Sequence, residues 1–356
     1  MVSKLSTNIR VIQYGLGPIG RAMARYMVEK PGFDLVGAVD VDPAKVGSDI
    51  GRVIGLGGSL GHVVCERLAH VTSEADVVAH ATSSHFHVFR EQIVEMLEAG
   101  FDVVSTAEEL SFPWLAHPRE AAEVDALAKR VGRTVLGTGI NPGFIMDYLP
   151  LCLTAICQRV DRIDVVRRVD ASARRGPFQA KIGSGLTVEE FDGRMAAGRM
   201  GHVGLPESMD MIADTLGRTL IRREYQVEPV VASRPIKTDH VEVQPGRVAG
   251  LRQVARGYTD DGEFLTLTMV ASLEQGDDAA PFEPAAPSEP AAPSEPAAPS
   301  GPWDTIRITG EPDLEVRLKG VHGDIATVAI AVNAIPGVRA APAGLVTMRD
   351  LSIVTV

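Results

Sequence analysis

The sequence predicts an α/β protein with an N-terminal doubly wound parallel sheet and a second α+β domain built on a mainly antiparallel sheet. Three observations predict this fold. A glycine-rich turn follows the first apolar run, short apolar runs alternate with helical patterns as far as about residue 140, and the segments after Val160 are longer and rich in Val, Arg and Thr. Alternating strands and helices imply right-handed crossovers and a parallel sheet covered on both faces. Ligands bind such sheets at the carboxyl ends of the strands, so we expect the site there.

The first apolar run, residues 9–14, leads into a turn with the spacing G-x-G-x-x-G, which consists of Gly15, Leu16, Gly17, Pro18, Ile19 and Gly20. Gly15 permits the tight turn out of the strand, Gly17 lets the backbone approach a pyrophosphate, and Gly20 allows close packing of helix on strand. Pro18 suits a first helical turn, and apolar residues recur behind it at helical spacing. This pattern is typical of a Rossmann domain that binds a nicotinamide dinucleotide; the alternative is a purely structural strand, turn and helix.

Asp40 stands twenty residues after Gly20, at the end of a second apolar run. An acidic residue at this spacing accepts hydrogen bonds from the adenosine ribose hydroxyls. Asp40 and Asp42 should repel a 2′-phosphate and favour NAD, whereas Lys45 or Arg52 can fold over such a phosphate. The sequence therefore leaves both NAD and NADP open as the cofactor.

The remaining elements of the first domain follow in order along the chain. Short apolar runs predict strands over residues 76–81, 101–105 and 134–137. Helical spacing of apolar residues predicts helices over 86–97 and 121–131. Together with the first strand and helix, these elements make up a dinucleotide-binding domain over residues 1–148.

The second domain, residues 149–320, is predicted from longer segments. Strands are expected over 162–171, 225–236, 247–258, 264–273 and 305–319, with helices over 188–200 and 206–220. This combination is typical of a domain for substrate binding and dimerisation. Residues 321–356 form a C-terminal segment with a helical apolar pattern, which we expect to return toward the first domain.

Three copies of EPAAPS occupy residues 283–300, inside a proline-rich insertion at 276–302. The segment lacks the apolar content to pack, and its prolines favour extended polyproline II structure. We expect a disordered insertion at the tip of a hairpin between the strands at 264–273 and 305–319. Sequence drift in a solvent loop is the favoured interpretation, and a ligand for proline-recognising modules is the alternative.

A chain of 356 residues exceeds the size at which one hydrophobic core stops growing, which also favours two domains. With 35 basic and 46 acidic residues it has a net charge of −11 and no basic stripe, so nucleic acid is not an expected partner. Cys65, Cys152 and Cys157 are too few and too scattered for a disulfide framework, which favours a reducing compartment. The lack of a signal-peptide pattern or a long apolar run predicts a cytoplasmic protein without membrane contact.

Three loops follow strands of the first domain, where the ligand is expected. The first, suited to lie along the nicotinamide ribose, consists of Ala81, Thr82, Ser83, Ser84 and His85. In the second, residues 105–110, Thr106 and Ala107 are expected beside the cofactor and precede two acids, Glu108 and Glu109. The third, residues 137–144, is glycine-rich, and we expect a helix starting near Pro142 to aim its N–H groups at a ligand.

The paired acids Glu108 and Glu109 end an apolar strand, where an acid can be solvated or cap a helix. Their position beside the expected cofactor site supports a catalytic role equally well. His85 and His87 form an H-x-H pair without nearby cysteines or a set of carboxylates. We interpret them as loop histidines, and no metal is expected.

Other candidate residues lie in the third loop and beyond it. Asn141 and Asn333 are candidates for hydrogen bonds to the nicotinamide amide, with a turn or helix-packing role as the alternative. Phe144 and Met146 are predicted to form an apolar wall of the substrate pocket, or else to be core. His202 is predicted to line the same pocket, or to be an ordinary hydrogen-bonded histidine.

The segments VVSTAEELSFPW from Val103 and GTGINPGFIMDYLP from Gly137 resemble the 2,4-diaminopentanoate dehydrogenases and the related native amine dehydrogenases, within the dihydrodipicolinate-reductase-like superfamily. The resemblance covers nearly the whole chain, including GHVGLPES from Gly201, GDIATVAIAVNAIPGV and the ending GLVTMRDL. It implies a homodimer of Rossmann and α/β domains that interconverts an amine with a ketone plus ammonia, using NAD or NADP. It also implies that Glu108 is the catalytic carboxylate and that Glu109 supports it.

Other functions remain open at this point. Besides a 2,4-diaminopentanoate dehydrogenase proper, the fingerprint permits a dihydrodipicolinate-reductase-like C=N reductase, but the E-[LV]-H-H run and following lysine of that family are absent. A non-catalytic nucleotide sensor would need no acid at position 108, so the presence of Glu108 argues against this function. The expected substrates are a small amine, or a ketone with ammonia. A diamino acid needs a cationic partner for its carboxylate, for which the candidates are Arg167, Arg168, Arg174 and Lys181.

Overall fold

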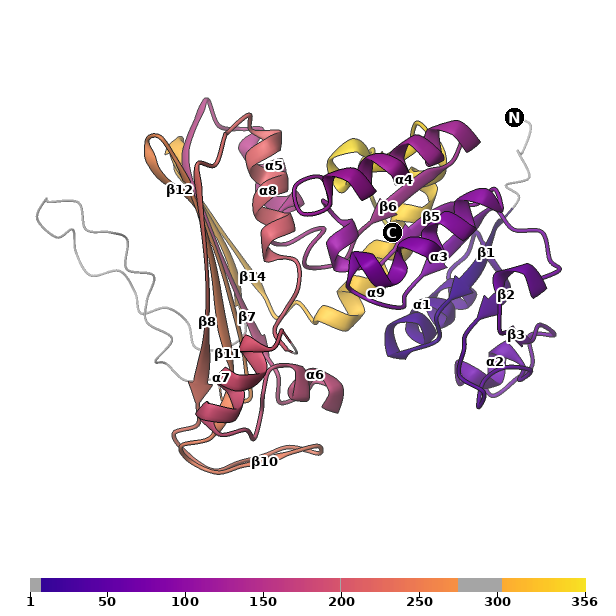
Figure 1. Ribbon diagram of the computed structural model, residues 1–356, viewed down its shortest axis with the longest axis horizontal. Helices are drawn as coiled ribbons and strands as arrows, with labels where there is room; N and C mark the ends of the chain where they lie inside the picture. The colour runs from indigo at the N-terminus through magenta and orange to yellow at the C-terminus, as the bar shows by residue number, and fades with distance from the viewer. Residues whose placement is uncertain (1–7, 199, 275–302) are drawn as a thin grey trace, which may run out of the picture. The chain divides into compact units, whose positions relative to one another are not determined.

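The computed structural model describes residues 8–198, 200–274 and 303–356, and the chain divides into two compact units (Figure 1). The first unit comprises Met1–Ile156, Val203–Thr219 and His322–Val356. The second comprises Cys157–His202 and Leu220–Val321. The segment Val203–Thr219, which the sequence pattern placed in the second domain, is therefore part of the first unit.

The described part of the first unit contains a parallel sheet of seven strands in the order β15-β6-β5-β4-β1-β2-β3. Its strands are β1 (Ile9–Tyr14), β2 (Phe33–Val39), β3 (Val64–Cys65), β4 (Val77–His80), β5 (Asp102–Ser105), β6 (Thr134–Gly137) and β15 (Gly344–Val346). The strand order reverses between β1 and β4, which is the switch point where ligands bind in such sheets. The predicted doubly wound parallel sheet is confirmed.

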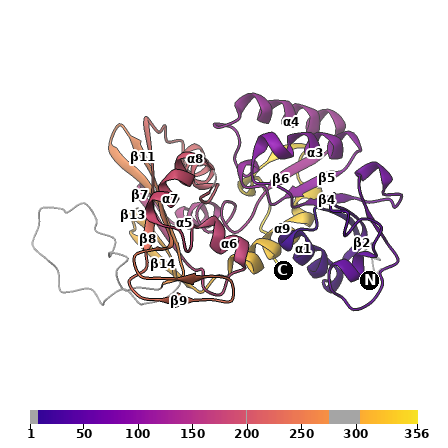
Figure 2. The ribbon, with the colours of Figure 1, turned by 60° about the horizontal axis from the view of Figure 1, so that its bottom comes forward.

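Helices pack on both faces of this sheet, as Figure 2 shows. One apolar core lies under α1 (Pro18–Glu29) and α9 (Gly323–Ala340), and another lies under α3 (Phe86–Glu98) and α4 (Pro118–Val131). The shorter helices of the unit are α2 (Ile50–Val53), α5 (Tyr148–Thr154) and α8 (Leu205–Thr215), with 3₁₀ turns η1 (Leu68–His70), η2 (Glu108–Leu110) and η3 (Met348–Asp350). The periodic apolar residues of each long helix form these cores, because every third or fourth side chain falls on the same helix face.

Helix α9 confirms that the C-terminal segment returns to the first domain. Val328, Val332, Ile335 and Val338 are buried in the core that α9 shares with α1. Ile325, which fits the same apolar pattern, lies in the first turn of α9 and is exposed. Burial of four large apolar side chains on one face contributes several kcal/mol, so α9 is an integral part of the first unit.

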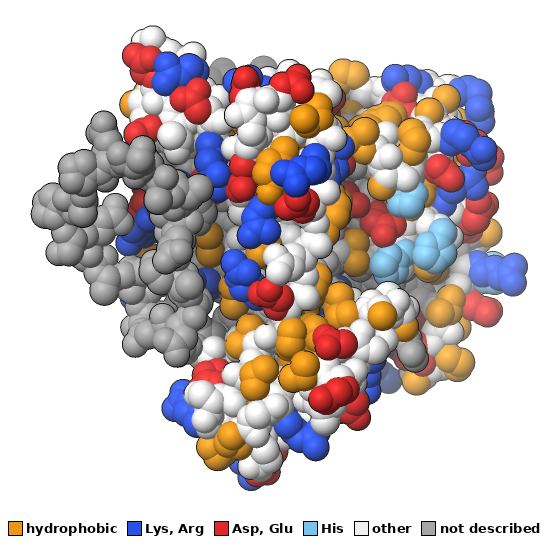
Figure 3. Space-filling view, turned by 60° about the vertical axis from the view of Figure 1, so that its left-hand side comes forward, with side chains coloured by type: hydrophobic (Ala, Val, Ile, Leu, Met, Phe, Trp, Pro, Cys, Tyr) orange, Lys and Arg blue, Asp and Glu red, His pale blue; other side chains and the backbone are white. Residues whose placement is uncertain are grey.

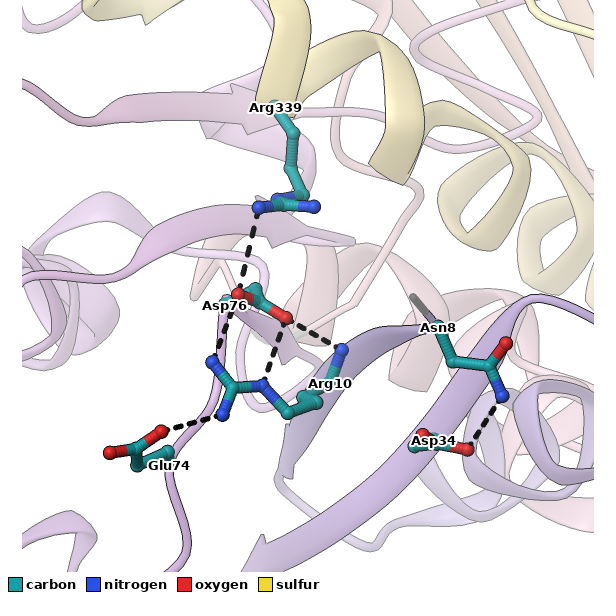
Figure 4. A network of polar contacts seen from close by, with 6 residues as sticks. All are labelled: Asn8, Arg10, Asp34, Glu74, Asp76 and Arg339. Atoms are coloured by element: carbon teal, nitrogen blue, oxygen red, sulfur yellow. Dashed lines mark hydrogen bonds and ion pairs between the residues drawn. The ribbon is translucent and has the colours of Figure 1, made fainter. Parts of the chain in front are cut away.

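An ionic network ties α9 to the amino ends of the sheet strands (Figure 4). Asp76, just before β4, accepts hydrogen bonds from the backbone N–H of Arg10 on β1 at 2.8 Å and from its Nε at 3.3 Å. Arg339, in the last turn of α9, lies 3.6 Å from the other Asp76 oxygen, and Glu74 pairs with Arg10 at 2.8 Å. This network lies at the edge opposite the carboxyl ends of the strands.

In the second unit, the described residues form a mixed sheet of six strands in the order β14-β13-β7-β12-β11-β8. The strands are β7 (Arg159–Asp170), β8 (Arg222–Val231), β11 (Val248–Thr259), β12 (Gly262–Ser272), β13 (Trp303–Glu311) and β14 (Leu314–Lys319). Neighbouring strands are antiparallel except β7 and β12, which are parallel. The unit also contains α6 (Gly176–Lys181), α7 (Val188–Ala196) and a ribbon of β9 (Ile236–Lys237) with β10 (Glu242–Val243).

The expected hairpin around the EPAAPS insertion is wrong. Strand β12 pairs with β7 on one side and β13 pairs with β7 on the other, so β12 and β13 do not pair with each other. Nearness in sequence had suggested a hairpin, but β7 buries Ile163, Val165 and Val169 and hydrogen-bonds along both of its edges. The insertion itself, residues 276–302, lies outside the described residues.

Candidate active site

The glycine-rich turn between β1 and α1 has the geometry of a pyrophosphate cradle. Gly15 has a φ of +86°, and a Cβ there would lie 2.4 Å from the carbonyl oxygen of Ala81. A Cβ on Gly20 would lie 1.9 Å from the carbonyl oxygen of Gly15, whereas a Cβ on Gly17 would meet nothing within 4 Å. The turn and the helix packing therefore require glycine, and the space over Gly17 admits a phosphate group. Together with the N-terminus of α1, where Pro18 begins the helix, these residues fit a dinucleotide.

The remaining residues of the turn fix its position. The side chain of Leu16 is fully buried, and Ile19 packs against the same core. The backbone N–H of Leu16 donates to the Asp40 carboxylate at 2.7 Å. Strand β2 ends directly before Asp40, so this carboxylate links the ends of the first two strands.

Asp40 is held as a fixed carboxylate beside a lysine. Its oxygens accept the backbone N–H of Asp42 at 2.8 Å and lie 3.1 Å from Lys45 Nζ, which is also 3.3 Å from Asp42. Although burial alone would raise the pKa of Asp40, the N–H groups of Asp42 and Leu16 and the Lys45 ammonium hold it below its usual value. The carboxylate of Asp40 and the ammonium group of Lys45 thus lie side by side at the end of β2.

The first loop lies between the glycine-rich turn and the second loop. Ala81 donates its N–H to the carbonyl oxygen of Tyr14 at 2.8 Å, and the Thr82 hydroxyl lies 2.8 Å from His80 Nε2. The Ser83 hydroxyl accepts the N–H of His85 at 3.3 Å, and the Ser84 carbonyl accepts the N–H of Glu109 at 3.2 Å in the second loop. Two of the predicted loops are therefore joined at the carboxyl ends of β4 and β5.

The second loop separates the two acids. Thr106 donates its N–H to the carbonyl oxygen of His80 at 3.0 Å, and Ala107 donates its N–H to the Ser105 hydroxyl at 3.1 Å. Glu108, half-buried, is the first residue of η2, and its carbonyl oxygen accepts the Ser111 hydroxyl at 2.8 Å. Glu108 therefore follows the carboxyl end of β5, as the sequence pattern predicts.

Glu109 is occupied by neighbours at the N-terminus of α3. It accepts the N–H of Phe86 at 2.5 Å and lies 2.9 Å from His85 Nδ1 and 3.3 Å from His117 Nε2. Burial would raise the pKa of Glu109, but the Phe86 N–H and the two histidines lower it on balance. Figure 3 shows histidine side chains gathered beside acidic ones on one face of the molecule. Glu109 is thus a helix-capping carboxylate.

The third loop does not begin a helix at Pro142, and this expectation is wrong. Gly143 has a φ of +123°, which no helix accommodates, and α5 begins only at Tyr148. Asp147, fully buried, accepts the N–H groups of Gly143 at 2.7 Å and of Tyr148 at 2.6 Å. The N–H of Gly143 is therefore satisfied within the protein. A Cβ on Gly137 would lie 2.4 Å from the carbonyl carbon of Leu110, so this loop packs directly on η2.

Helix α8 also belongs to this site, although the sequence pattern did not place it there. Gly204 precedes it with a φ of +118°, and a Cβ there would lie 2.3 Å from Pro142 Cδ. The Ser208 hydroxyl donates to Asp147 at 2.7 Å. These contacts hold the first turn of α8 against the third loop and bring Glu207 to the site.

Glu207 is the functional candidate that sequence reasoning missed. Its side chain is 5% exposed, and its Oε2 atom has no hydrogen-bond partner in the described parts of the chain. Burial raises the pKa of Glu207 to about 7, with further contributions from the carboxylates of Glu109, Asp210 and Glu108. The available signal was the motif GHVGLPES, which contains Glu207 as well as the predicted pocket residue His202.

Asn141 and Asn333 are the two candidates for hydrogen bonds to the nicotinamide amide. Asn141 is buried at a cis bond to Pro142, and the N–H of the preceding Ile140 donates to Thr327 on α9 at 3.3 Å. Asn333 Oδ1, on α9, accepts a hydrogen bond from the Tyr26 hydroxyl, on α1, at 3.4 Å. This contact agrees with the alternative role of Asn333 in helix packing.

The two apolar candidates of the third loop differ in burial. Phe144 is half-buried, with its ring 6.2 Å from that of Tyr148. Met146 is fully buried, which favours a core role for it. His202 belongs to the second unit, where its backbone exchanges hydrogen bonds with Gln253.

Among the residues that the structure describes, no group of His, Cys, Asp and Glu side chains could hold a metal ion. The rings of His85 and His87 stack 5.8 Å apart. Of the arginines considered for a substrate carboxylate, Arg167 is buried and pairs with Asp304 at 3.0 Å in the second unit. The charge of Arg167 is therefore already paired with that of Asp304.

Comparisons with known proteins agree with this geometry. The domain family described as the 2,4-diaminopentanoate dehydrogenase C-terminal domain matches residues 144–275 and 292–356, and the dihydrodipicolinate reductase N-terminus matches residues 9–107. A 2,4-diaminopentanoate dehydrogenase from Acetoanaerobium sticklandii is 35% identical over 351 residues, which cover 97% of this chain and 94% of that one. The chain belongs to the 2,4-diaminopentanoate dehydrogenase family. The predicted resemblance is confirmed.

This chain is also similar to amine dehydrogenases in sequence and in structure. An amine dehydrogenase from Streptomyces virginiae is 26% identical over 190 residues, which cover 51% of this chain and 52% of that protein. The structure of an amine dehydrogenase from Mycobacterium smegmatis superposes with a TM-score of 0.82 at 28% identity, covering 98% of this chain and 97% of that one. The protein is therefore an oxidoreductase that acts on CH–NH₂ groups, with an NAD(P)-binding domain like that of dihydrodipicolinate reductase. None of the described helices is long and apolar enough to span a membrane.

Proposed function

We propose that this protein interconverts a small amine with a ketone plus ammonia, with Glu108 as the acid/base group. The observation that carries the proposal is the pair of acids after β5, in which Glu109 caps α3 and Glu108 is the half-buried first residue of η2. Glu108 lies on η2 beside it, at the edge where the first loop meets the second. The neighbouring first turn of α8 adds a further carboxylate to this edge.

The coenzyme fits the glycine-rich turn and Asp40, and when bound it exchanges hydride with the substrate carbon. An alkylammonium group has a pKa of about 10, like that of lysine, and its carbon releases hydride only after the nitrogen has lost a proton. Glu108 takes that proton, and the substrate becomes an iminium ion as hydride leaves. Water then adds to the iminium carbon and loses one proton to solvent, which gives a carbinolamine. Glu108 returns its proton to the nitrogen, and ammonia departs as the carbinolamine hydroxyl loses its proton and becomes the ketone oxygen. Amination follows the same steps in reverse.

We further propose that both NAD and NADP serve as coenzyme. Asp40 suits a ribose with free hydroxyls, and Lys45, 3.1 Å away, offers a cation to a 2′-phosphate. Because one lysine neutralises two neighbouring acids, the local repulsion of a phosphate is reduced. Homodimeric assembly and a cytoplasmic location stay predictions from the sequence.

The substrate class follows from the same chemistry. A compound of the 2,4-diaminopentanoate type, named in the relative that is 35% identical to this chain, is the first substrate to test, followed by simple alkyl amines. The dihydrodipicolinate-reductase-like alternative has less support, because the match to that family ends at residue 107. Residues beyond it match the 2,4-diaminopentanoate dehydrogenase domain instead.

The test is Glu108→Gln, assayed by coenzyme absorbance with amine and NAD or NADP. We expect a loss in kcat of roughly 10² to 10⁴, the usual contribution of general acid–base catalysis, with coenzyme binding retained. Glu66→Gln, at an exposed acid remote from these loops in sequence, is the matched control and should retain full activity. If Glu108→Gln stays within a factor of two of wild type, the assignment is wrong.

A further inference from the structure

Glu207 is a buried carboxyl group without a complete set of hydrogen bonds. It lies in the first turn of α8, which Gly204 and Ser208 fix against the third loop. Only 5% of the residue is exposed, and Oε2 finds no donor among the described residues. A buried acceptor without a donor destabilises the folded state, and more so if it is charged. A bound ligand that supplies an N–H donor would remove this destabilisation.

The surroundings of Glu207 select a cation. The carboxylates of Glu108 and Glu109 on η2 and of Asp210 on α8 act on it electrostatically. Two histidines lie within 3.3 Å of Glu109 and partly compensate its charge. Glu108 and Asp210 still place negative charge near Glu207. Within the described ranges, no side chains are arranged to hold a metal ion. An ammonium group, which brings both a positive charge and N–H donors, satisfies both requirements.

We propose that Glu207 is a second catalytic carboxylate, which accepts an N–H from the ammonium group of the amine or from free ammonium while Glu108 exchanges its proton. The assignment rests on the proposed amine dehydrogenase function. It gives the site two carboxylates for one nitrogen: Glu207 binds and orients the cation, and Glu108 acts on the N–H that lies opposite. The unpartnered Oε2 atom is the acceptor.

The protonation of Glu207 makes this role dependent on pH. Burial, together with the charges of Glu109, Asp210 and Glu108, outweighs the hydrogen bond from the backbone N–H of Glu207 itself and raises its pKa to about 7. The other charged groups around α8 are Asp147, which holds Ser208, and Arg349, which pairs with Asp214 at the far end. When ammonium binds, the Glu207 proton passes to solvent and the ionised carboxylate faces the cation. Affinity for ammonium should therefore rise as pH increases through about 7.

The first experiment measures binding without turnover. Ammonium chloride is titrated calorimetrically into the enzyme–NAD complex at pH 6.5, in buffers of different ionisation enthalpy, with sodium chloride as the control titrant. We expect saturable binding of ammonium that releases most of one proton in wild type, and no proton release in Glu207→Gln. Absence of ammonium binding to wild type, or equal proton release from both proteins, would overturn the proposal.

The second experiment measures kinetics of reductive amination between pH 6 and 9. Loss of a hydrogen bond to a charged group is worth about 1.5 to 3 kcal/mol, so Glu207→Gln should raise the KM for ammonium roughly 10- to 100-fold. Its kcat should stay within a few-fold of wild type, and the rise of kcat/KM through pH 7 should disappear. Glu207→Asp should restore part of the pH dependence, and Glu66→Gln should behave as wild type.

These outcomes separate the two proposals. Proton-linked ammonium binding without turnover of any amine would refute the proposed function, but it would support the proposed binding of ammonium by Glu207. Turnover that depends on Glu108, with an unchanged KM and pH profile in Glu207→Gln, would do the reverse. Loss of NAD binding in Glu207→Gln would mean that the side chain is structural, and would also overturn the proposal.

Discussion

Replacement of Glu207 by glutamine should stabilise the folded protein, and increasingly so as pH rises. Burial, with the nearby acids, raises the pKa of Glu207 from 4.5 to about 7. The folded state therefore binds a proton that the unfolded state has lost between these values. Because the pKa of this acid is raised in the folded state, the unfolding free energy of the wild type falls as pH rises from 4.5 to about 7, and it is lowest above pH 7. Glutamine keeps the shape of the side chain and has no such dependence.

The size of the effect follows from the shift. A change from 4.5 to about 7 corresponds to about 3 kcal/mol at pH 8, at 1.36 kcal/mol per pKa unit. At pH 5, which is only about half a unit above the unfolded-state pKa of 4.5, the difference is about 1 kcal/mol. The advantage of Glu207→Gln over wild type should therefore grow by about 2 kcal/mol between pH 5 and pH 8. Relaxation of the site around the charge makes this an upper estimate.

Thermal unfolding of both proteins at several pH values measures this difference. For a unit of about 200 residues, 1 kcal/mol shifts Tm by roughly 2 to 4 °C, so several degrees are expected at pH 8 and about 2 to 4 °C at pH 5. Any constant gain or loss from the amide group cancels, because only the change with pH is interpreted. Glu66→Gln, at an exposed acid, should show no such trend. A Tm difference that is the same at pH 5 and pH 8 would refute the reasoning.

Three further predictions concern other parts of the chain. Lys45→Ala should raise the KM for NADP several-fold and leave that for NAD nearly unchanged; equal effects on both coenzymes would contradict its proposed role at a 2′-phosphate. Gly20→Ala should lower Tm, because its Cβ would lie 1.9 Å from a backbone oxygen, whereas Gly17→Ala should weaken coenzyme binding in fluorescence titrations at unchanged Tm. Arg167→Met should cost about 3 to 5 kcal/mol in denaturant unfolding, because it leaves the buried Asp304 unpaired. That loss should be smaller at pH 5, since burial raises the pKa of Asp304 to about 6, and a double variant with Asp304→Leu should recover part of it.

Local patterns predicted most of the first unit. The run before Gly15 is β1 with the expected bounds, and the strand at 134–137 is β6. Gly15 has the positive φ of a tight turn, and Gly20 lies against the backbone of Gly15, five residues earlier in the chain. In such cases the residue types alone report the backbone geometry.

Features that depend on distant parts of the chain were not predictable in this way. The insertion of β7 between β12 and β13 depends on pairing across more than one hundred residues. The turn at Gly143 depends on its N–H bonding to Asp147, and the place of α8 depends on contacts of Gly204 with Pro142. Glu207 looked like an ordinary acid in a helix because two of its acidic neighbours, Glu108 and Glu109, come from η2, about one hundred positions earlier in the chain.

The junction of Asp76 with Arg10 and Arg339 has a consequence for biosynthesis. It joins a strand made early in translation to a helix made after the whole second unit has emerged from the ribosome. The second unit can therefore acquire its sheet while the coenzyme-binding unit still exposes the apolar surface that α9 will cover. Truncation before residue 322 should leave that surface open and the nascent chain prone to aggregation or chaperone capture.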